Sequence, residues 1–175
     1  MKILSFYGPQ GAGKSESAKA VASLQGWHRL SFAGPLYDMM SVLLRTDARS
    51  LPKSEPLDAL CGKTLREALQ SLGTDWGRDK IGKTIWLDAM GRRIDEMRKN
   101  GSVGVVIDDL RFANEYRFLY GIGATIVRVE RKDTLIPTLN GGHASEMDWM
   151  NFTADVVVRN DGSVEELTEL VTALT

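Results

Sequence analysis

Residues 8–15 form a glycine-rich turn, Gly-Pro-Gln-Gly-Ala-Gly-Lys-Ser, that matches the phosphate-loop pattern at every fixed position. An apolar run at residues 3–7 precedes the turn and a helix-forming stretch at residues 16–24 follows it. In such a strand–turn–helix unit the glycines let successive backbone N–H groups point at phosphate oxygens, and the helix adds the positive end of its dipole. The chain is therefore expected to bind a nucleotide at this turn.

The side chains that end this phosphate loop suit the β- and γ-phosphates of a nucleoside triphosphate. Lys14 supplies a positive charge for these phosphates, and the Ser15 hydroxyl is expected to ligate a magnesium ion that bridges them. ATP and Mg²⁺ are thus the expected cofactors. The residues expected to contact them here are Gly11, Ala12, Gly13, Lys14, Ser15 and Glu16.

Strands and helices alternate along the chain. The run at residues 103–108 is apolar and β-branched before its final acid, which indicates a strand buried on both faces of a parallel sheet. The expected fold class is therefore α/β, a three-layer P-loop NTPase fold with helices on both faces of a parallel central sheet of about five strands. Further strands are expected at residues 29–32, 125–129 and 155–158, and helices at residues 36–44, 115–120 and 164–174.

Between residues 65 and 97, apolar side chains recur at helical spacing and predict two amphipathic α-helices around residues 73–82. At 175 residues the chain is expected to fold as a single domain, residues 1–175, so accessory structure must be inserted into it. The apolar positions of the two helices are Leu65, Leu69, Leu72 and Trp76, then Trp86, Met90, Ile94 and Met97.

Composition excludes several classes of partner. The formal net charge of -1 gives no basic field for gripping duplex nucleic acid, so no nucleic-acid partner is expected. No apolar run approaches the roughly 20 residues of a membrane span, so no membrane partner is expected either. The single cysteine, Cys61, cannot form an internal disulfide, which fits a reducing compartment and makes the cytoplasm the expected location.

Two acids follow the buried strand, and either can serve magnesium. Asp108 or Asp109 is expected to hold a metal-bound water, as a Walker B acid does, although an acid there can also merely cap a turn. Arg111 lies close to the same strand end, where its guanidinium can stabilise charge on a transferring phosphoryl group. A surface salt bridge is an equally good interpretation of Arg111.

The rest of the sequence must separate kinases from other P-loop proteins. The Asn-Lys-x-Asp motif by which GTPases read guanine is absent from the sequence. Phosphoryl transfer between two anions needs several cations around the meeting point. Arg66 and Arg78 lie off the apolar stripe of their segment, so they are candidates for holding an acceptor phosphate, although a solvated helix face explains them as well.

With these motifs in place, the sequence resembles the deoxynucleoside monophosphate kinases of tailed bacteriophages, within the P-loop nucleoside monophosphate kinases. The resemblance covers nearly the whole chain, and its five blocks occur in matching order. The blocks are the phosphate loop, residues 31–36 (Ser-Phe-Ala-Gly-Pro-Leu), residues 65–79, residues 107–115 and residues 143–146 (His-Ala-Ser-Glu).

The resemblance implies ATP- and Mg²⁺-dependent phosphorylation of a deoxynucleoside 5′-monophosphate, in the host cytoplasm if the chain is phage-encoded. It implies an NMP-binding insertion at about residues 34–82 and a lid over ATP at about residues 131–150. The substrate-binding residues it implies are Phe32, Ala33, Leu36, Arg66, Gly73, Thr74, Asp75, Arg78, Glu115 and His143. The catalytic residues it implies are Lys14, Arg66, Asp109, Arg111 and Arg131, and the adenine contacts are Asn160 and Gly162.

Two other functions stay open at this point. One is another small-molecule P-loop kinase, such as a dephospho-coenzyme A kinase, although residues 28–32 lack the aspartate that such kinases place after the second strand. The other is a P-loop ATPase module that phosphorylates no small molecule. The sequence leaves the oligomeric state open between a monomer and a homodimer.

Overall fold

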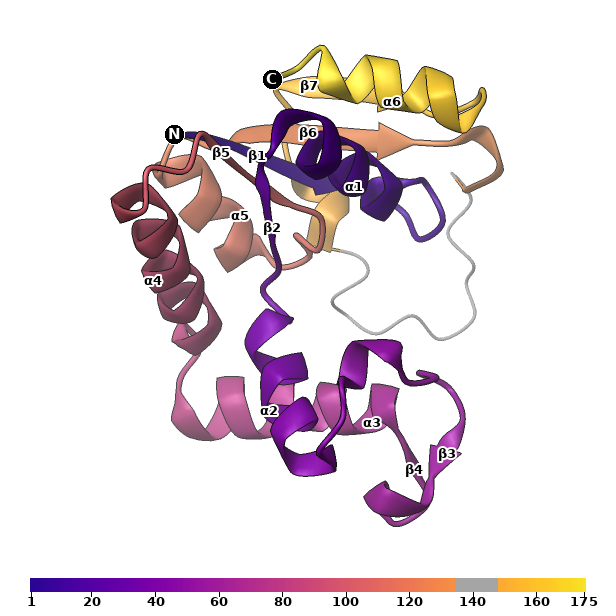
Figure 1. Cartoon of the computed structure of the whole chain (residues 1–175), viewed down its shortest axis with the longest axis vertical. Coiled ribbons are helices and arrows are strands. Elements are labelled where there is room, and N and C mark those ends of the chain that lie inside the picture. Colours follow the sequence, from indigo (N-terminus) through magenta and orange to yellow (C-terminus); the bar gives the residue numbers. More distant parts are fainter. Residues whose placement is uncertain (135–147) are drawn as a thin grey trace. The chain divides into compact units, whose positions relative to one another are not determined.

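A five-stranded parallel sheet, in the order β2-β5-β1-β6-β7, forms the framework of the molecule (Figure 1). The computed structural model describes residues 1–134 and 148–175. Strand β1 lies at the centre of the sheet, and all five of its residues after Lys2 are buried. The strands are β1 (Lys2–Tyr7), β2 (His28–Leu30), β5 (Gly104–Ile107), β6 (Thr125–Glu130) and β7 (Val156–Arg159).

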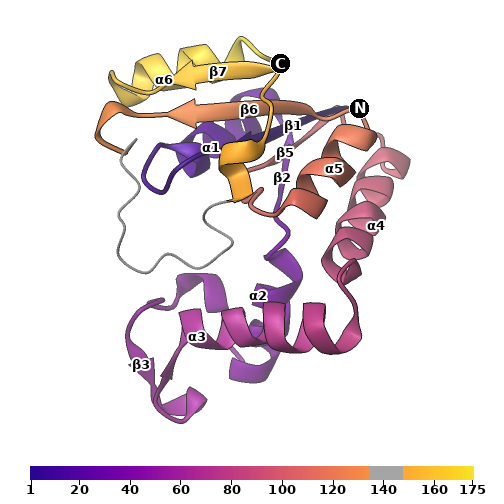
Figure 2. The same cartoon turned by 180° about the vertical axis from the view of Figure 1, so that it is seen from behind.

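Helices cover both faces of this sheet (Figures 1 and 2). Helices α1 (Lys14–Gln25) and α6 (Val164–Thr172) pack on one face, and α5 (Ala113–Gly121) packs on the other. A capping box between Ser163 and Glu166 starts α6. The expected α/β class, with a parallel sheet between helices, is confirmed. Side chains that share the core between α1, α6 and the sheet include Leu4, Phe6, Val21, Val106, Val127, Val129, Leu167 and Val171.

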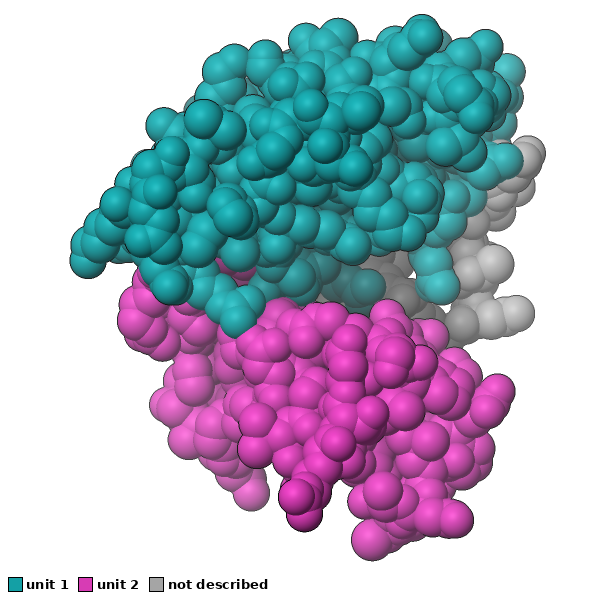
Figure 3. Space-filling view, in the orientation of Figure 1, with its two compact units in different colours: residues 1–31, 93–175 teal, residues 32–92 magenta. Residues whose placement is uncertain are grey.

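The chain divides into two compact units (Figure 3). The sheet unit comprises Met1–Ser31 and Arg93–Thr175, and also carries the short helices η4 (Lys132–Thr134) and η6 (Asp148–Asn151). The inserted unit, Phe32–Arg92, has its own small core around Met40, Ala48 and Leu65. Its elements are α2 (Gly34–Leu44), η1 (Ala48–Ser50), the hairpin β3 (Pro56–Leu57) and β4 (Lys63–Thr64) around η2 (Asp58–Leu60), α3 (Leu65–Gln70), η3 (Ser71–Ile81) and the start of α4 (Ile85–Lys99).

The helix expected through Trp76 is only partly an α-helix. After α3 the chain continues as a π-helix, η3, in which the Gly82 N–H donates to the Gly77 carbonyl five residues earlier. The buried Trp86 indole lies beside η3 and donates from Nε1 to the Gly73 carbonyl at 2.8 Å. A Cβ at Gly77 would lie 2.7 Å from Trp86 Cε2, so the indole fits only against a glycine. Trp76, on η3, is exposed, where α-helical spacing predicts a core position.

Cys61 lies at the surface of the inserted unit. It is a free, exposed thiol that follows η2 with a backbone φ of 54°. Within residues 1–134 and 148–175, every helix is too short or too polar to cross a bilayer.

Candidate active site

The phosphate loop follows β1 and depends on glycine at several positions. Gly8, Gly11 and Gly13 have φ values of 135°, 81° and 106°, a backbone conformation that residues other than glycine rarely adopt. A Cβ at Gly8 would overlap the Val129 carbonyl oxygen, and one at Gly13 would overlap the amide nitrogen of Asn160. Among residues 1–134 and 148–175, no side chain caps the start of α1 at Gly13, so the first N–H groups of α1 suit an anion.

Lys14 lies in the loop, as its motif predicts. Its ammonium donates to the carbonyls of Gly8 at 2.9 Å and Pro9 at 2.6 Å. Burial and, to a lesser extent, the nearby positive charge of Arg111 lower the pKa of Lys14, Asp108 partly opposes both effects, and the resulting pKa is about 8. Lys14, Arg111 and Asp108 therefore share one electrostatic environment next to the phosphate loop.

Asp108 is held by an arginine that sequence reasoning missed. Arg29, on β2, donates to both oxygens of the buried Asp108 carboxylate, from Nη2 at 2.6 Å and Nε at 3.2 Å. Burial acts against the guanidinium charge, but the hydrogen bond and charge of Asp108 outweigh it and raise the pKa of Arg29. The pair forms because β2 and β5 are neighbours in the sheet, with Arg29 in register with Val106. The spacing of residues in the sequence does not indicate that β2 and β5 are adjacent in the sheet.

Asp109 differs from Asp108 in its surroundings. Its Oδ2 accepts a hydrogen bond from the Ser31 hydroxyl at 2.7 Å, and the residue is only partly buried. Asp108 thus has a guanidinium partner on both oxygens, whereas Asp109 receives a neutral hydroxyl donor. Which of the two acids serves a metal-bound water stays a prediction.

Glu115 orders the backbone that carries Arg111. Its carboxylate is buried, and Oε2 accepts the N–H groups of Arg111 at 3.0 Å and Phe112 at 3.1 Å. These bonds fix the turn between β5 and α5, while the Arg111 side chain is exposed. Direct contact between Glu115 and a substrate stays a prediction.

The segment after β7 supports the phosphate loop from the side. The Asn160 side chain is buried, and its amide nitrogen donates to the Ala12 carbonyl at 2.8 Å. Gly162 lies against the Glu166 carboxylate of the α6 capping box, which would have to move if position 162 carried a Cβ. The expected adenine contacts of Asn160 and Gly162 stay predictions, but Asn160 is shown to contact the loop itself.

Eight of the ten residues expected to bind the substrate lie in the inserted unit, and the other two are Glu115 and His143. Phe32 and Leu36 are buried there, and Leu36 packs so closely on Gly73 that a Cβ at Gly73 would lie 3.0 Å from Leu36 Cδ1. Thr74, Asp75 and Arg78 follow on η3. Ala33 precedes α2, and Arg66 is exposed in the first turn of α3.

The expected lid is described only at its ends. Arg131 follows β6 and is exposed, and its carbonyl accepts hydrogen bonds from the Thr134 N–H and hydroxyl. His143 falls within residues 135–147, outside the described residues.

Comparison with known proteins identifies the family to which this chain belongs. A family model described as "Deoxynucleotide monophosphate kinase" matches residues 62–171, more than half of the chain. The chain belongs to this family. A protein of Acanthamoeba polyphaga mimivirus described as "Putative deoxynucleotide monophosphate kinase" is 28% identical over 182 residues, which cover 95% of this chain and 92% of the viral one. The resemblance seen in the sequence is thus confirmed at the level of the family, and the chain is a P-loop kinase, a phosphotransferase.

Solved structures support the fold of this deoxynucleotide monophosphate kinase family member. The dephospho-CoA kinase from Campylobacter jejuni has a TM-score of 0.51 at 14% identity, over 99% of this chain and 96% of that one. An unliganded sugar kinase from Janibacter sp. HTCC2649 has a TM-score of 0.50 at 15% identity, over 99% and 93%. At such identities the likeness establishes a shared kinase fold and nothing about substrates.

Proposed function

We propose that the protein transfers the γ-phosphoryl group of ATP to a deoxynucleoside 5′-monophosphate, giving ADP and a deoxynucleoside 5′-diphosphate. The observation that carries the proposal is a complete phosphate loop, with its partly buried lysine, in a chain of the deoxynucleotide monophosphate kinase family. A strong general base is unnecessary, because the acceptor phosphate has a second pKa of about 6 and is largely ionised near neutral pH. Catalysis then rests on positioning and charge neutralisation.

The sheet unit binds the donor in this proposal. The backbone of Gly11, Ala12 and Gly13, with Glu16 at the border, surrounds the ATP phosphates, and Lys14 neutralises their charge. Arg111, whose charge reaches Lys14, stabilises charge on the transferring phosphoryl group.

The residues also fit a magnesium ion next to ATP. The Ser15 hydroxyl is exposed in the first turn of α1 and is an oxygen ligand of the kind that Mg²⁺ prefers. Asp109 is proposed to hold a metal-bound water, because Asp108 is already paired with Arg29. The ion, when bound, would neutralise charge that develops on the β- and γ-phosphate oxygens.

The inserted unit binds the acceptor in this proposal. Arg66 and Arg78 hold the monophosphate, as guanidinium groups suit a phosphate's paired oxygens. The nucleoside lies along Phe32, Ala33 and Leu36, with the wall formed by Gly73, Thr74 and Asp75. Glu115, and Arg131 and His143 of the lid, are proposed to complete the substrate contacts, and the closed lid limits ATP hydrolysis by excluding water.

The test is ADP release, followed in a coupled assay with each deoxynucleoside monophosphate, each ribonucleoside monophosphate, dephospho-CoA and no acceptor. ADP release that depends strictly on a deoxynucleoside monophosphate supports the proposal. Release without an acceptor would indicate an ATPase module, and preference for dephospho-CoA would indicate the other kinase class. Either result would overturn the proposal.

Two variants assign the roles. Lys14→Met should abolish turnover, whereas the matched control Lys19→Met changes an exposed lysine on the same helix and should leave turnover intact. Arg66→Ala should chiefly raise the KM for the monophosphate and leave the KM for ATP unchanged.

A further inference from the structure

Strand β7 forms one edge of the five-stranded sheet. It is last in the strand order, so one side pairs with β6 and the other pairs with no strand among residues 1–134 and 148–175. Natural proteins usually protect such edges with lysine, proline or a bulge, because unpaired backbone groups recruit another strand. Here the edge carries three consecutive valines, Val156–Val158.

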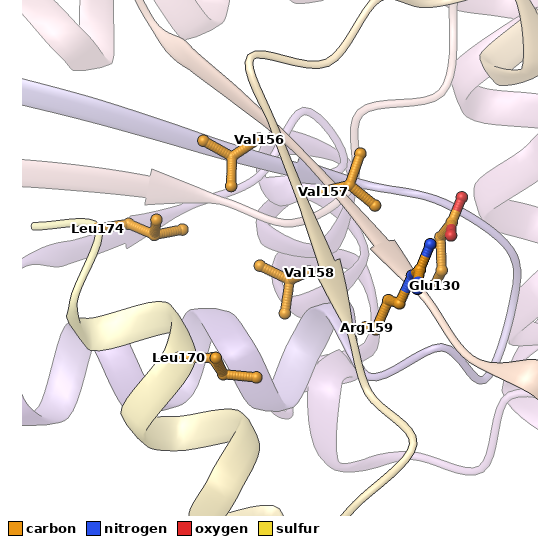
Figure 4. A pocket seen from close by; sticks show the side chains of 7 residues that line it. All are labelled: Glu130, Val156, Val157, Val158, Arg159, Leu170 and Leu174. Carbon is orange, nitrogen blue, oxygen red and sulfur yellow. The ribbon is translucent and has the colours of Figure 1, made fainter.

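A shallow apolar groove of about 630 Å³ runs along this edge. Figure 4 shows Val156 and Val158 on one side of β7, facing Leu170 of α6 and Leu174 just beyond it, and Val157 and Arg159 on the other side. Val157 is 51% exposed and Leu170 is 49% exposed. The edge therefore offers both unpaired backbone and apolar side chains to an incoming strand. The groove is lined by Glu130, Val156, Val157, Val158, Arg159, Leu170 and Leu174.

The sequence of this edge is complementary to itself when two copies run antiparallel. With a two-fold axis at Val157, Val156 faces Val158 of the other copy, and the exposed Asp155 faces the exposed Arg159. Opposite charges directly across an antiparallel pair are stabilising, and this arrangement forms the contact twice. Shifting the axis to Val158 would instead place Asp155 opposite Asp161, which is unfavourable.

We propose that β7 pairs with β7 of a second copy of this chain, antiparallel about a two-fold axis at Val157. The two five-stranded sheets become one continuous sheet, and the α6 helices bring their Leu170 and Leu174 side chains together beside it. The pairing does not depend on the kinase reaction, because β7 and α6 supply all the residues it uses.

The test is sedimentation equilibrium of the full chain over a concentration series. The wild type should show a reversible monomer–dimer equilibrium. Val157→Glu places two carboxylates opposite each other at the axis and should raise the dimer dissociation constant at least about tenfold. The matched control is Val164→Glu, at a valine that is 61% exposed at the start of α6 and does not line the groove, and its dissociation constant should equal that of the wild type.

A charge exchange tests the register. Arg159→Asp alone should weaken the dimer, because two aspartates then face each other, and adding Asp155→Arg should restore it. Circular dichroism melting checks that each variant folds, since Asp155 also accepts a hydrogen bond from the Ile126 N–H. A wild type that stays monomeric at every concentration, or a dimer unaffected by Val157→Glu, would overturn the proposal. ADP release by the same samples reports separately on the kinase function.

Discussion

Gly77→Ala should destabilise the inserted unit by about 2 kcal/mol. The new Cβ would lie 2.7 Å from Trp86 Cε2 and 2.8 Å from its Nε1, well inside van der Waals contact. The indole is buried and cannot swing away freely, so overpacking costs about 1–3 kcal/mol. A displaced indole also loses its bond to the Gly73 carbonyl, about 1 kcal/mol, while alanine gains about 1 kcal/mol over glycine in a helix.

Urea denaturation measures this change, followed by tryptophan fluorescence because Trp76 and Trp86 both lie in the inserted unit. Gly82→Ala is the matched control, since Gly82 has an extended backbone and nothing within 4 Å of an added Cβ. Its free energy of unfolding should match that of the wild type. If Gly77→Ala were as stable as the control, the Trp86 indole would not be what restricts position 77 to glycine. Because η3 carries Thr74, Asp75 and Arg78, the Gly77 variant should also raise the KM for the monophosphate more than that for ATP.

Three further predictions concern the sheet unit. Above pH 8, ATP binding should be accompanied by proton uptake and should weaken by up to about tenfold per pH unit, because Lys14 has a pKa of about 8 and bound phosphate favours its charged form. Calorimetry in two buffers measures the proton uptake, and Lys14→Gln should abolish it. Arg29→Ala should lower the free energy of unfolding, measured by urea denaturation, by about 1–3 kcal/mol. This range is below that of a fully buried ion pair because the Arg29 side chain is 40% exposed. The loss should be smaller in an Asp108→Asn background. Asn160→Asp replaces the donor to the Ala12 carbonyl with an acceptor and should lower ATP affinity about tenfold in calorimetry, with acceptor affinity unchanged.

Local patterns predicted the parts of this molecule that local chemistry determines. Apolar runs located the five strands of the parallel sheet to within two residues at each end, as β1 and β6 illustrate, and the glycine spacing located the phosphate loop. The short hairpin of β3 and β4 was not predicted. The helices expected to start at residues 36 and 164 begin at Gly34 and Val164 in the structure. In each case the signal and the structure it specifies lie within a few residues of each other.

Sequence patterns could not predict contacts between residues that lie far apart in the chain. The Arg29–Asp108 pair joins residues 79 apart and depends on which strands are neighbours. The bond from Asn160 to Ala12 spans 148 residues. The π-helix was missed for the same reason, because Trp86, which lies beside Gly73 and Gly77, comes from the next helix. Period-based reasoning treats each helix alone and cannot detect such a neighbour.

The lone thiol of the inserted unit has a practical consequence. Because Cys61 is the chain's single cysteine and is exposed, one maleimide fluorophore would label that unit at a defined point without any engineered residue. Energy transfer between that dye and a fluorescent ATP analogue would then measure, in real time, the distance between the inserted unit and the bound nucleotide.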